Sequence, residues 1–325
     1  MDENVVALAA RLAGRAVESV EPVRGGGNNR LFRVRSDGAA FALKIYAGNA
    51  RDSRERYARE FAGLSFLWRR GERRIAQPLA LDEGERAGLY SWLDGGSGGA
   101  ASEADLSAMC DFARALFDAR LDPAAAGLAE AREAVFSPAD LAAQLAMRLE
   151  RLRRVEDAHP ELRPLLADIA REVGRRLPDG AAADPLPPTA RTLSPSDFGT
   201  HNALRTTRGL AFIDFEYFGW DDPVKLVADV LCHPGMALEA SGRQKFFSEA
   251  ADVYRVEPGF MPRFEREAPV YGLRWALIVL NEFLPEVWQR RLAAGAVDDA
   301  PAARARQLAK AAHLVERARC GVVVA

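Results

Sequence analysis

The chain has 325 residues, of which 49% are hydrophobic and 28% are charged, and its formal net charge at pH 7 is −2. These proportions are typical of a globular protein with one large domain or two lobes. The balance of charge argues against nucleic acid or an anionic membrane as partner, because both select a basic surface. An acidic N-terminus and three widely spaced cysteines argue against a secretory signal, a disulfide framework and a metal-binding cysteine pair. We therefore expect a cytoplasmic protein.

The first part of the chain predicts an antiparallel meander. Short apolar-alternating runs are separated by turns rich in glycine, asparagine and aspartate, which is the pattern of β-hairpins. We expect strands near residues 17–23, 30–35, 40–46, 79–81 and 88–93. Residues 52–70 place apolar side chains at helical spacing among charges, which predicts an amphipathic helix. The glycine-rich segment 94–99 then predicts a hinge.

Beyond this hinge the pattern is mainly helical. We expect helices near residues 102–120, 138–155, 161–176, 223–232, 242–254, 265–291 and 301–318. Residues 191–216 instead alternate short β runs with polar turns. The prediction is an α+β fold of two lobes: residues 1–94 form a small antiparallel β-sheet lobe with one helix, and residues 95–325 form a larger, mainly helical lobe. A cleft between two lobes is a preferred place for a ligand site.

The densest group of chemically active residues lies in this β-rich insertion. Asp197 and Asn202 are separated by four residues and lie between two apolar runs, and Asp214 ends the second run. Phosphoryl transfer from ATP requires a carboxylate that accepts the proton of the acceptor hydroxyl, and oxygen ligands that hold Mg²⁺ against the phosphates. We predict that Asp197 is the catalytic base and that Asn202 and Asp214 are the metal ligands.

This loop resembles the catalytic loop of the aminoglycoside phosphotransferase and choline kinase-like family, which reads H-G-D-x-x-x-x-N and is followed by an I-D-[FW]-E strand. The matching residues here are Asp197 and Asn202, the run Ile213-Asp-Phe-Glu216, and the pair Asp222-Pro223. Together with the glycine turn, a downstream strand lysine and the hinge, the resemblance covers nearly the whole chain. It implies a protein-kinase-like fold whose first lobe binds the nucleotide and whose helical lobe carries the catalytic loop and the acceptor site.

Two features complicate the resemblance. Pro195 and Ser196 replace the histidine and glycine that precede the aspartate in the family, which affects loop geometry more than chemistry. In addition, Asp197-Phe198-Gly199 spells the metal-binding motif of protein kinases. No aspartate with a partnered asparagine lies a loop upstream, so we interpret Asp197 as part of the D-x-x-x-x-N loop.

The nucleotide side is predicted from a glycine turn and a strand lysine. Backbone N–H groups of a glycine-rich turn can approach phosphates closely, and such a turn is formed by Gly25, Gly26, Gly27 and Asn28. Lys44 lies in an apolar strand and would bind the α- and β-phosphates, with Glu60 as its ion partner and Glu55 in reserve. An exposed edge-strand lysine is the alternative. The resemblance further implies that the strand ending in Ser91, Trp92 and Leu93 passes behind the adenine ring.

Several polar residues near these motifs have weaker interpretations. His201 adjoins Asn202 and is interpreted as orienting the loop, and Asp222 as capping the helix that begins at Pro223. Glu216 is left open between attracting a cationic substrate and a local structural role. Lys225 lies in the first turn of the same helix, where the dipole does not favour a cation, and the sequence gives no reason for it.

The leading hypothesis is an ATP- and Mg²⁺-dependent phosphotransferase that acts on a hydroxyl of a small metabolite such as a sugar, an amino sugar or an amino alcohol. The alternative is a catalytically weak or inactive nucleotide-binding regulator with the same fold, suggested by Pro195 and Ser196. A protein kinase is disfavoured because few residues separate Asp214 from Pro223, which leaves little room for a peptide-docking loop. The sequence leaves the acceptor, the choice of ATP over GTP and the oligomeric state open.

Overall fold

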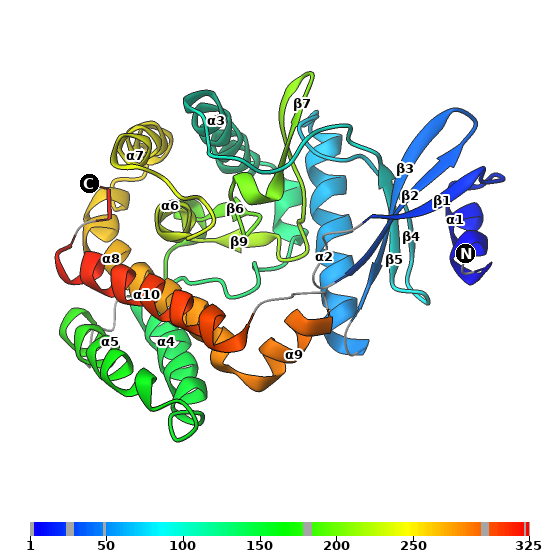
Figure 1. The fold of residues 1–325 in the computed structure, drawn as a ribbon. Helices are drawn as coiled ribbons and strands as arrows, with labels where there is room; N and C mark the ends of the chain where they lie inside the picture. The colour runs from blue at the N-terminus through cyan, green and yellow to red at the C-terminus, as the bar shows by residue number, and fades with distance from the viewer. Residues whose placement is uncertain are drawn as a thin grey trace. The chain divides into compact units, whose positions relative to one another are not determined.

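Figure 1 shows the computed structural model, which describes residues 3–23, 29–47, 50–177, 184–293, 299–321 and 323–324. The chain divides into two units, which we describe separately. The first unit comprises Met1–Gly99, Ala115–Arg132 and Leu193–Trp220. The second comprises Ala100–Arg114, Glu133–Thr192 and Asp221–Ala325. The predicted boundary after residue 94 divides the chain by function, into a nucleotide-binding lobe and a catalytic lobe, and stays a prediction.

An antiparallel five-stranded sheet with the order β1-β2-β3-β5-β4 forms much of the first unit. Its strands are β1 (Ser19–Val23), β2 (Asn29–Ser36), β3 (Ala39–Tyr46), β4 (Pro78–Asp82) and β5 (Ala87–Ser91). All five predicted strands are present, displaced by only one or two residues at their ends. Side chains alternate between the faces of a strand, so Lys44 and Leu43 of β3 lie on opposite faces.

One face of the sheet is covered by a helix that the sequence analysis missed. Helix α1 (Glu3–Ala13) buries Val5, Leu8 and Ala9 in a core cluster with apolar residues of the sheet, Leu43 among them. The prediction of one helix for this part of the chain was therefore wrong. At 11 residues α1 is too short to be stable alone, and packing on the sheet supplies most of its stability.

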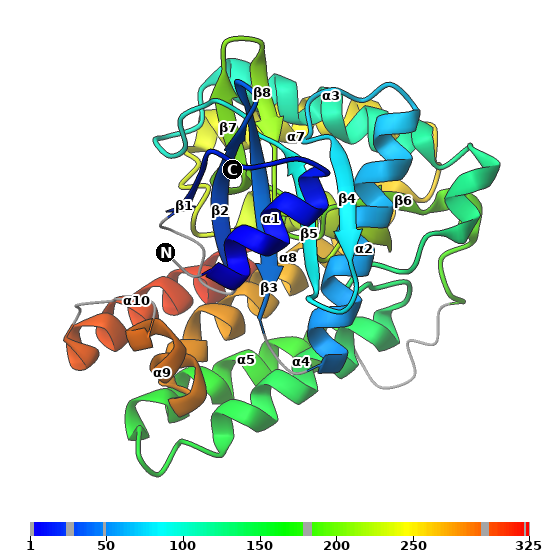
Figure 2. The ribbon, with the colours of Figure 1, turned by 90° about the vertical axis from the view of Figure 1, so that its right-hand side faces the viewer.

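The opposite face of the sheet carries the predicted amphipathic helix, α2 (Ala50–Arg69). Figures 1 and 2 show α1 and α2 on the two sides of the sheet. Helix α2 buries Tyr57, Glu60 and Leu64, which recur at intervals of three and four residues. The sheet face with Lys44 therefore lies toward the helix face with Glu60.

The glycine-rich segment 94–99, predicted as a hinge, pairs with strand β7 (Ala203–Thr206). Gly96 and Arg205 exchange two backbone hydrogen bonds, of 2.8 and 3.1 Å, and the Arg205 guanidinium donates to the carbonyl of Gly98. A Cβ on Gly95 would lie 2.9 Å from the Arg205 carbonyl oxygen, so this approach requires glycine. The segment is therefore attached to the β-rich insertion by hydrogen bonds.

The β-rich insertion forms two small two-stranded sheets and a 3₁₀ turn. Its elements are β6 (Thr192–Ser194), η4 (Thr200–Asn202), β7 (Ala203–Thr206), β8 (Gly209–Phe212) and β9 (Gly219–Asp221). Strands β7 and β8 form a hairpin in which Ala203 pairs with Phe212. This hairpin returns the chain from Asn202 to the segment that begins with Ile213.

Helices make up nearly all of the second unit's regular structure. The α-helices beyond the glycine-rich segment are α3 (Glu103–Ala119), α4 (Pro138–Arg153), α5 (Arg163–Arg176), α6 (Pro223–Cys232), α7 (Ala240–Tyr254), α8 (Phe260–Val279), α9 (Pro285–Ala293) and α10 (Ala300–Arg319). Helix α8 packs against α4, α5, α6 and α10. All ten residues of α6 are buried.

The single helix predicted for residues 265–291 is in fact two helices. A 3₁₀ turn (Leu280–Phe283) follows α8, and Leu284 has extended backbone angles of φ −78° and ψ 125° before Pro285 begins α9. The break has a local cause, because a proline ring disfavours helical geometry in the residue before it. Within the part of the chain that the structure describes, no helix is both long and apolar enough to cross a membrane.

Candidate active site

Lys44 and Glu60 form the ion pair that the sequence predicted. Lys44 Nζ lies 2.7 Å from Glu60 Oε2, and their side chains are only 13% and 6% exposed. Burial alone would lower the pKa of Lys44, but the negative charges of Glu60, Asp214 and Glu216 outweigh burial and raise it well above the usual lysine value. Lys44 is therefore a buried cation surrounded by carboxylates, and the edge-strand alternative does not apply.

Glu60 is held by two further groups, the hydroxyl of Tyr46 and the backbone N–H of Phe215. Tyr46, two residues after Lys44 on the same face of β3, donates a 2.6 Å hydrogen bond to Glu60 Oε2, and its hydroxyl lies 2.9 Å from that of Tyr90. The backbone N–H of Phe215 donates to Glu60 Oε1 at 3.3 Å. Burial, reinforced by the charge of Glu60, raises the pKa of Tyr46, so it remains a donor at ordinary pH. These bonds fix α2 to β3 and to the residue that follows Asp214.

Asp214 lies on the other side of the lysine. Its Oδ1 is 2.8 Å from Lys44 Nζ, and 41% of its side chain is exposed. Its φ of +65° lies in the left-handed region, which is uncommon for a residue other than glycine. Such strained positions are concentrated at functional sites.

Glu216 belongs to a second buried connection in the first unit, which the sequence analysis missed. Its Oε2 accepts hydrogen bonds from Asn29 Nδ2 at 2.7 Å and from Arg56 Nη1 at 3.2 Å. Arg56 Nη1 also donates to Asn29 Oδ1 at 2.9 Å. The sequence leaves Glu216 open between attracting a cationic substrate and a local structural role. Its side chain is only 4% exposed and is bonded to these partners, which favours the structural role.

Asp197 and Asn202 lie in one loop held by short-range contacts. Asn202 Nδ2 donates to the Asp197 carbonyl at 2.9 Å, and the Asn202 carbonyl accepts from the N–H of Ile213 at 3.0 Å. The second bond places Asn202 beside the segment that leads into Asp214. His201 Nε2 is 2.9 Å from Asp197 Oδ1, which agrees with its interpretation as a loop-orienting residue.

Ser196, which occupies the position of the family's glycine, has a left-handed backbone with φ of +71°. Its N–H donates to Ser194 Oγ at 2.9 Å, and its hydroxyl donates to the Arg132 carbonyl at 3.2 Å. A position that readily takes glycine is thus occupied here by serine, with two hydrogen bonds that support the turn.

The predicted metal ligands fit Mg²⁺ by their chemistry. Mg²⁺ prefers oxygen donors, and the carboxylate of Asp214 is partly exposed. The amide nitrogen of Asn202 is used by the Asp197 carbonyl, which leaves its amide oxygen as the donor for a cation. Carboxylate oxygens of Glu60, Asp214 and Glu216 also lie within 4.8 Å of one another.

The remaining nucleotide predictions are less well defined by the structure. Residues Gly25, Gly26, Gly27 and Asn28 lie outside the described residues. The N–H groups of Ser91 and Trp92 donate to the carbonyls of Gln77 and Ala40. These two N–H groups are used within the sheet. If the adenine ring is bound through a backbone N–H of residues 91–93, we therefore expect it to be that of Leu93.

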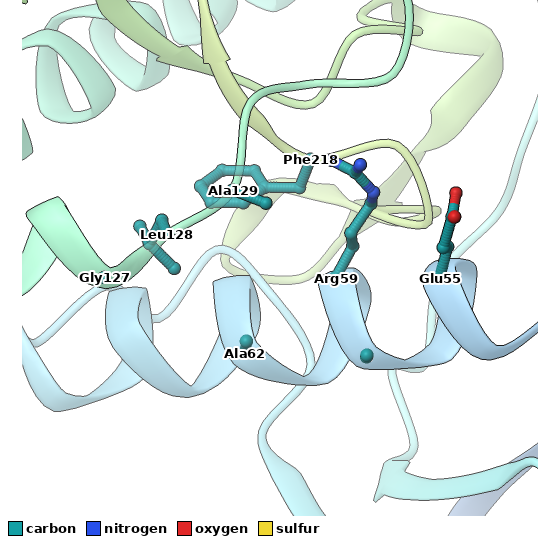
Figure 3. A pocket seen from close by; sticks show the side chains of 8 residues that line it. Glu55, Arg59, Ala62, Gly127, Leu128, Ala129 and Phe218 are labelled. Carbon is teal, nitrogen blue, oxygen red and sulfur yellow. The ribbon is translucent and has the colours of Figure 1, made fainter.

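Glu55, the reserve partner for Lys44, lies elsewhere on α2. Figure 3 shows Glu55 and Arg59 beside a cavity of about 280 Å³ that residues 127–129 and Phe218 also line. Arg59 donates to the carbonyl of Glu130. Helix α2 thus directs Glu60 to Lys44 and presents Glu55 to this cavity.

In the second unit the structure explains two residues near the start of α6. Asp222 caps the helix, as predicted, by accepting a 2.7 Å hydrogen bond from the N–H of Val224. Lys225 is buried and lies 2.6 Å from Asp221 and 3.3 Å from Asp229. Lys225 therefore neutralises two buried carboxylates, each four residues away, and the spacing to Asp229 within the helix was a signal that the prediction did not use.

Comparison with known proteins identifies the class. The model of the APH phosphotransferase enzyme family matches residues 19–267, which is more than half of the chain. The chain therefore belongs to the phosphotransferase enzyme family, and the resemblance inferred from its motifs is confirmed. A comparison with curated protein sequences gave no significant match.

Solved structures share the fold over nearly the whole chain. The spectinomycin phosphotransferase APH(9)-Ia, in complex with ADP and spectinomycin, is 13% identical, with a TM-score of 0.64 and coverage of 98% of both chains. A choline kinase from Cryptosporidium parvum Iowa II is 13% identical, with a TM-score of 0.62 and coverage of 99% of this chain and 98% of the other. A choline/ethanolamine kinase family protein from Mesorhizobium loti is 18% identical, with a TM-score of 0.56 and coverage of 99% of both. These similarities confirm the predicted kinase-like fold class.

Proposed function

We propose that this chain transfers the γ-phosphoryl group of ATP to a hydroxyl group of a small metabolite. The observation that carries the proposal is the buried Lys44, which contacts both Glu60 and Asp214, on segments far apart in the sequence. Family membership supports phosphoryl transfer. Structures with this fold that contain ADP with spectinomycin, or AMP-PNP with hygromycin B, support a nucleotide and a small molecule as ligands.

Each residue of the site has a proposed task. Lys44, held by Glu60, binds the α- and β-phosphates, and the turn of Gly25, Gly26, Gly27 and Asn28 binds phosphates through its N–H groups. Asn202 and Asp214 hold Mg²⁺, which when bound neutralises charge on the phosphates. Asp197 accepts the proton of the acceptor hydroxyl, and His201 orients its carboxylate. We assign nucleotide binding to residues 1–94 and the catalytic loop and acceptor site to residues 95–325.

The decisive experiment is Mg²⁺-dependent ATP consumption against a panel of sugars, amino sugars, amino alcohols and hydroxy amino acids. Asp197→Ala serves as the blank. A signal with one acceptor class that is absent from the blank supports the proposal and defines the substrate. If neither ATP nor GTP with Mg²⁺ binds the wild-type protein, the proposal is wrong.

A further inference from the structure

A buried polar cluster formed by Asn29, Arg56 and Glu216 lies within the first unit beside the site described above. Arg56 Nη1 bonds both Asn29 Oδ1 and Glu216 Oε2, and Asn29 Nδ2 bonds the same Glu216 oxygen. Arg56 and Glu216 are only 4% and 3% exposed as residues. A guanidinium and a carboxylate this deeply buried require partners, and here each is a partner of the other.

Each member of the cluster is next to a residue of the proposed nucleotide site. Asn29 is the first residue of β2 and directly follows the predicted phosphate-binding turn. Arg56 precedes Glu60 by four residues and so lies on the same face of α2. Glu216 follows Asp214 by two residues. The cluster therefore joins the first residue of β2, the helix that carries Glu60 and the segment that carries Asp214.

Charge gives the cluster a role in orienting Lys44. Lys44 Nζ is 2.7 Å from Glu60 and 2.8 Å from Asp214, but 3.9 Å from Glu216. Arg56, at 3.2 Å, is the closer cation to Glu216. If Arg56 lost its charge, Lys44 would be the nearest cation to a buried carboxylate and would be drawn away from Glu60 and Asp214.

We propose that Arg56 is a positioning residue for binding of the nucleotide phosphates. It neutralises Glu216, which keeps Lys44 directed at Glu60 and Asp214, and it fixes Asn29 at the start of β2. The inference rests on the proposed nucleotide site but not on transfer to any acceptor. It predicts a loss of nucleotide affinity, whereas a merely structural arginine would affect stability alone.

The test is calorimetric binding of Mg²⁺–ADP, which needs neither acceptor nor turnover. Arg56→Met should weaken binding by about tenfold, while Arg56→Met/Glu216→Gln, which removes both charges, should recover most of that loss. Arg59→Met is the matched control, because Arg59 lies on the same helix but faces the cavity of Figure 3. It should bind Mg²⁺–ADP as the wild type does.

Two results would overturn the inference: Arg56→Met binding as tightly as the wild type, or the double variant binding as weakly as Arg56→Met. If Arg56→Met does not fold, Asn29→Ala gives a second reading, since it removes an uncharged bond and should weaken binding about threefold. Unchanged binding by Asn29→Ala would then reject the proposal. Wild-type protein that binds Mg²⁺–ADP but phosphorylates no acceptor contradicts the proposed transfer reaction, and a loss of affinity in Arg56→Met would still support this inference.

Discussion

The imidazole of His201 contacts the carboxylate of Asp197, with Nε2 2.9 Å from Oδ1. The histidine is 23% exposed and the aspartate 42%, so the imidazole supports a carboxylate that remains open to solvent. A general base must be held within hydrogen-bonding reach of the proton that it accepts. We therefore expect Asp197, as the proton acceptor, to contribute more to turnover than His201, which only orients it.

His201→Ala should lower kcat roughly tenfold to a hundredfold and leave the KM for ATP unchanged, because a small misplacement of a catalytic group is costly. Asp197→Ala should lower kcat further, by about 10²- to 10⁴-fold. Steady-state kinetics with the acceptor found in the panel measures both. Equal losses in the two variants would assign His201 a direct role, and normal turnover in Asp197→Ala would remove Asp197 from the mechanism.

Lys44→Met should raise the KM for ATP and lower the free energy of unfolding by about 3 kcal/mol, because it leaves Glu60 buried without its cation. Its pH dependence can be stated in advance. The pKa of Lys44 is raised, so its contribution to stability is fully present below the usual lysine pKa and is lost only at higher pH. In Lys44→Met the burial of Glu60 is no longer opposed by a cation, which raises the pKa of this carboxyl further. The variant should therefore lose additional stability relative to the wild type as the pH rises and Glu60 ionises, as measured by urea denaturation at several pH values. A difference in unfolding free energy that is the same at every pH would contradict the buried ion pair.

Much of the site was predictable because its signals are local. The D-x-x-x-x-N spacing, a lysine alone in an apolar strand and a glutamate on the next helix indicated Asp197, Lys44 and Glu60. Arg56 was not predictable, because its partner Glu216 is 160 residues away and an arginine in a charged helix is ordinary. Contacts of this kind form only in the tertiary fold, and local patterns in a single sequence do not reveal which distant residues they join.

The fold was predictable to a similar extent and for similar reasons. Strands separated by glycine turns and helices with apolar periodicity were placed nearly correctly. Helix α1 was missed although Val5, Leu8 and Ala9 recur at helical spacing, a local signal that the prediction did not use. The end of α8 was missed because the apolar periodicity continued through Leu284, where the following proline disfavours helical geometry.

Ser196 provides a test of the loop that departs from the family pattern. Its φ of +71° is open to glycine without strain but is unfavourable for β-branched side chains. Ser196→Gly should be nearly neutral, and Ser196→Val should lower the unfolding free energy by about 1–2 kcal/mol. Urea denaturation of both variants measures the difference. A valine variant as stable as the glycine variant would contradict the left-handed backbone at this position.

Asp222 should make stability depend on pH. Burial raises its pKa to about 7, although the Arg263 charge opposes the shift. A carboxyl with a raised pKa contributes stability that is full below its ordinary pKa and is lost as pH rises through the folded value. The unfolding free energy of Asp222→Asn should therefore increase relative to that of the wild type between pH 4 and 8, by on the order of a few kcal/mol. Asp252→Asn, at an exposed carboxylate, is the control. A pH-independent difference for Asp222→Asn would show that Asp222 is ionised across this range.

Gly88 lies opposite Lys44 in the ladder between β3 and β5. A Cβ at this position would lie 2.5 Å from the Tyr90 hydroxyl oxygen, so Gly88→Ala must displace a buried ring whose hydroxyl contacts Tyr46, the second donor to Glu60. Overpacking of this kind costs about 1–3 kcal/mol, and we expect a raised KM for ATP as well, since Tyr46 helps to hold the partner of Lys44. Gly174→Ala is the matched control: it lies in α5 with no atom within 4 Å of the added methyl, and should stabilise the protein by about 0.5–1 kcal/mol. If Gly88→Ala is less stable but its KM for ATP is unchanged, the tyrosine pair does not contribute to nucleotide binding and this prediction is wrong.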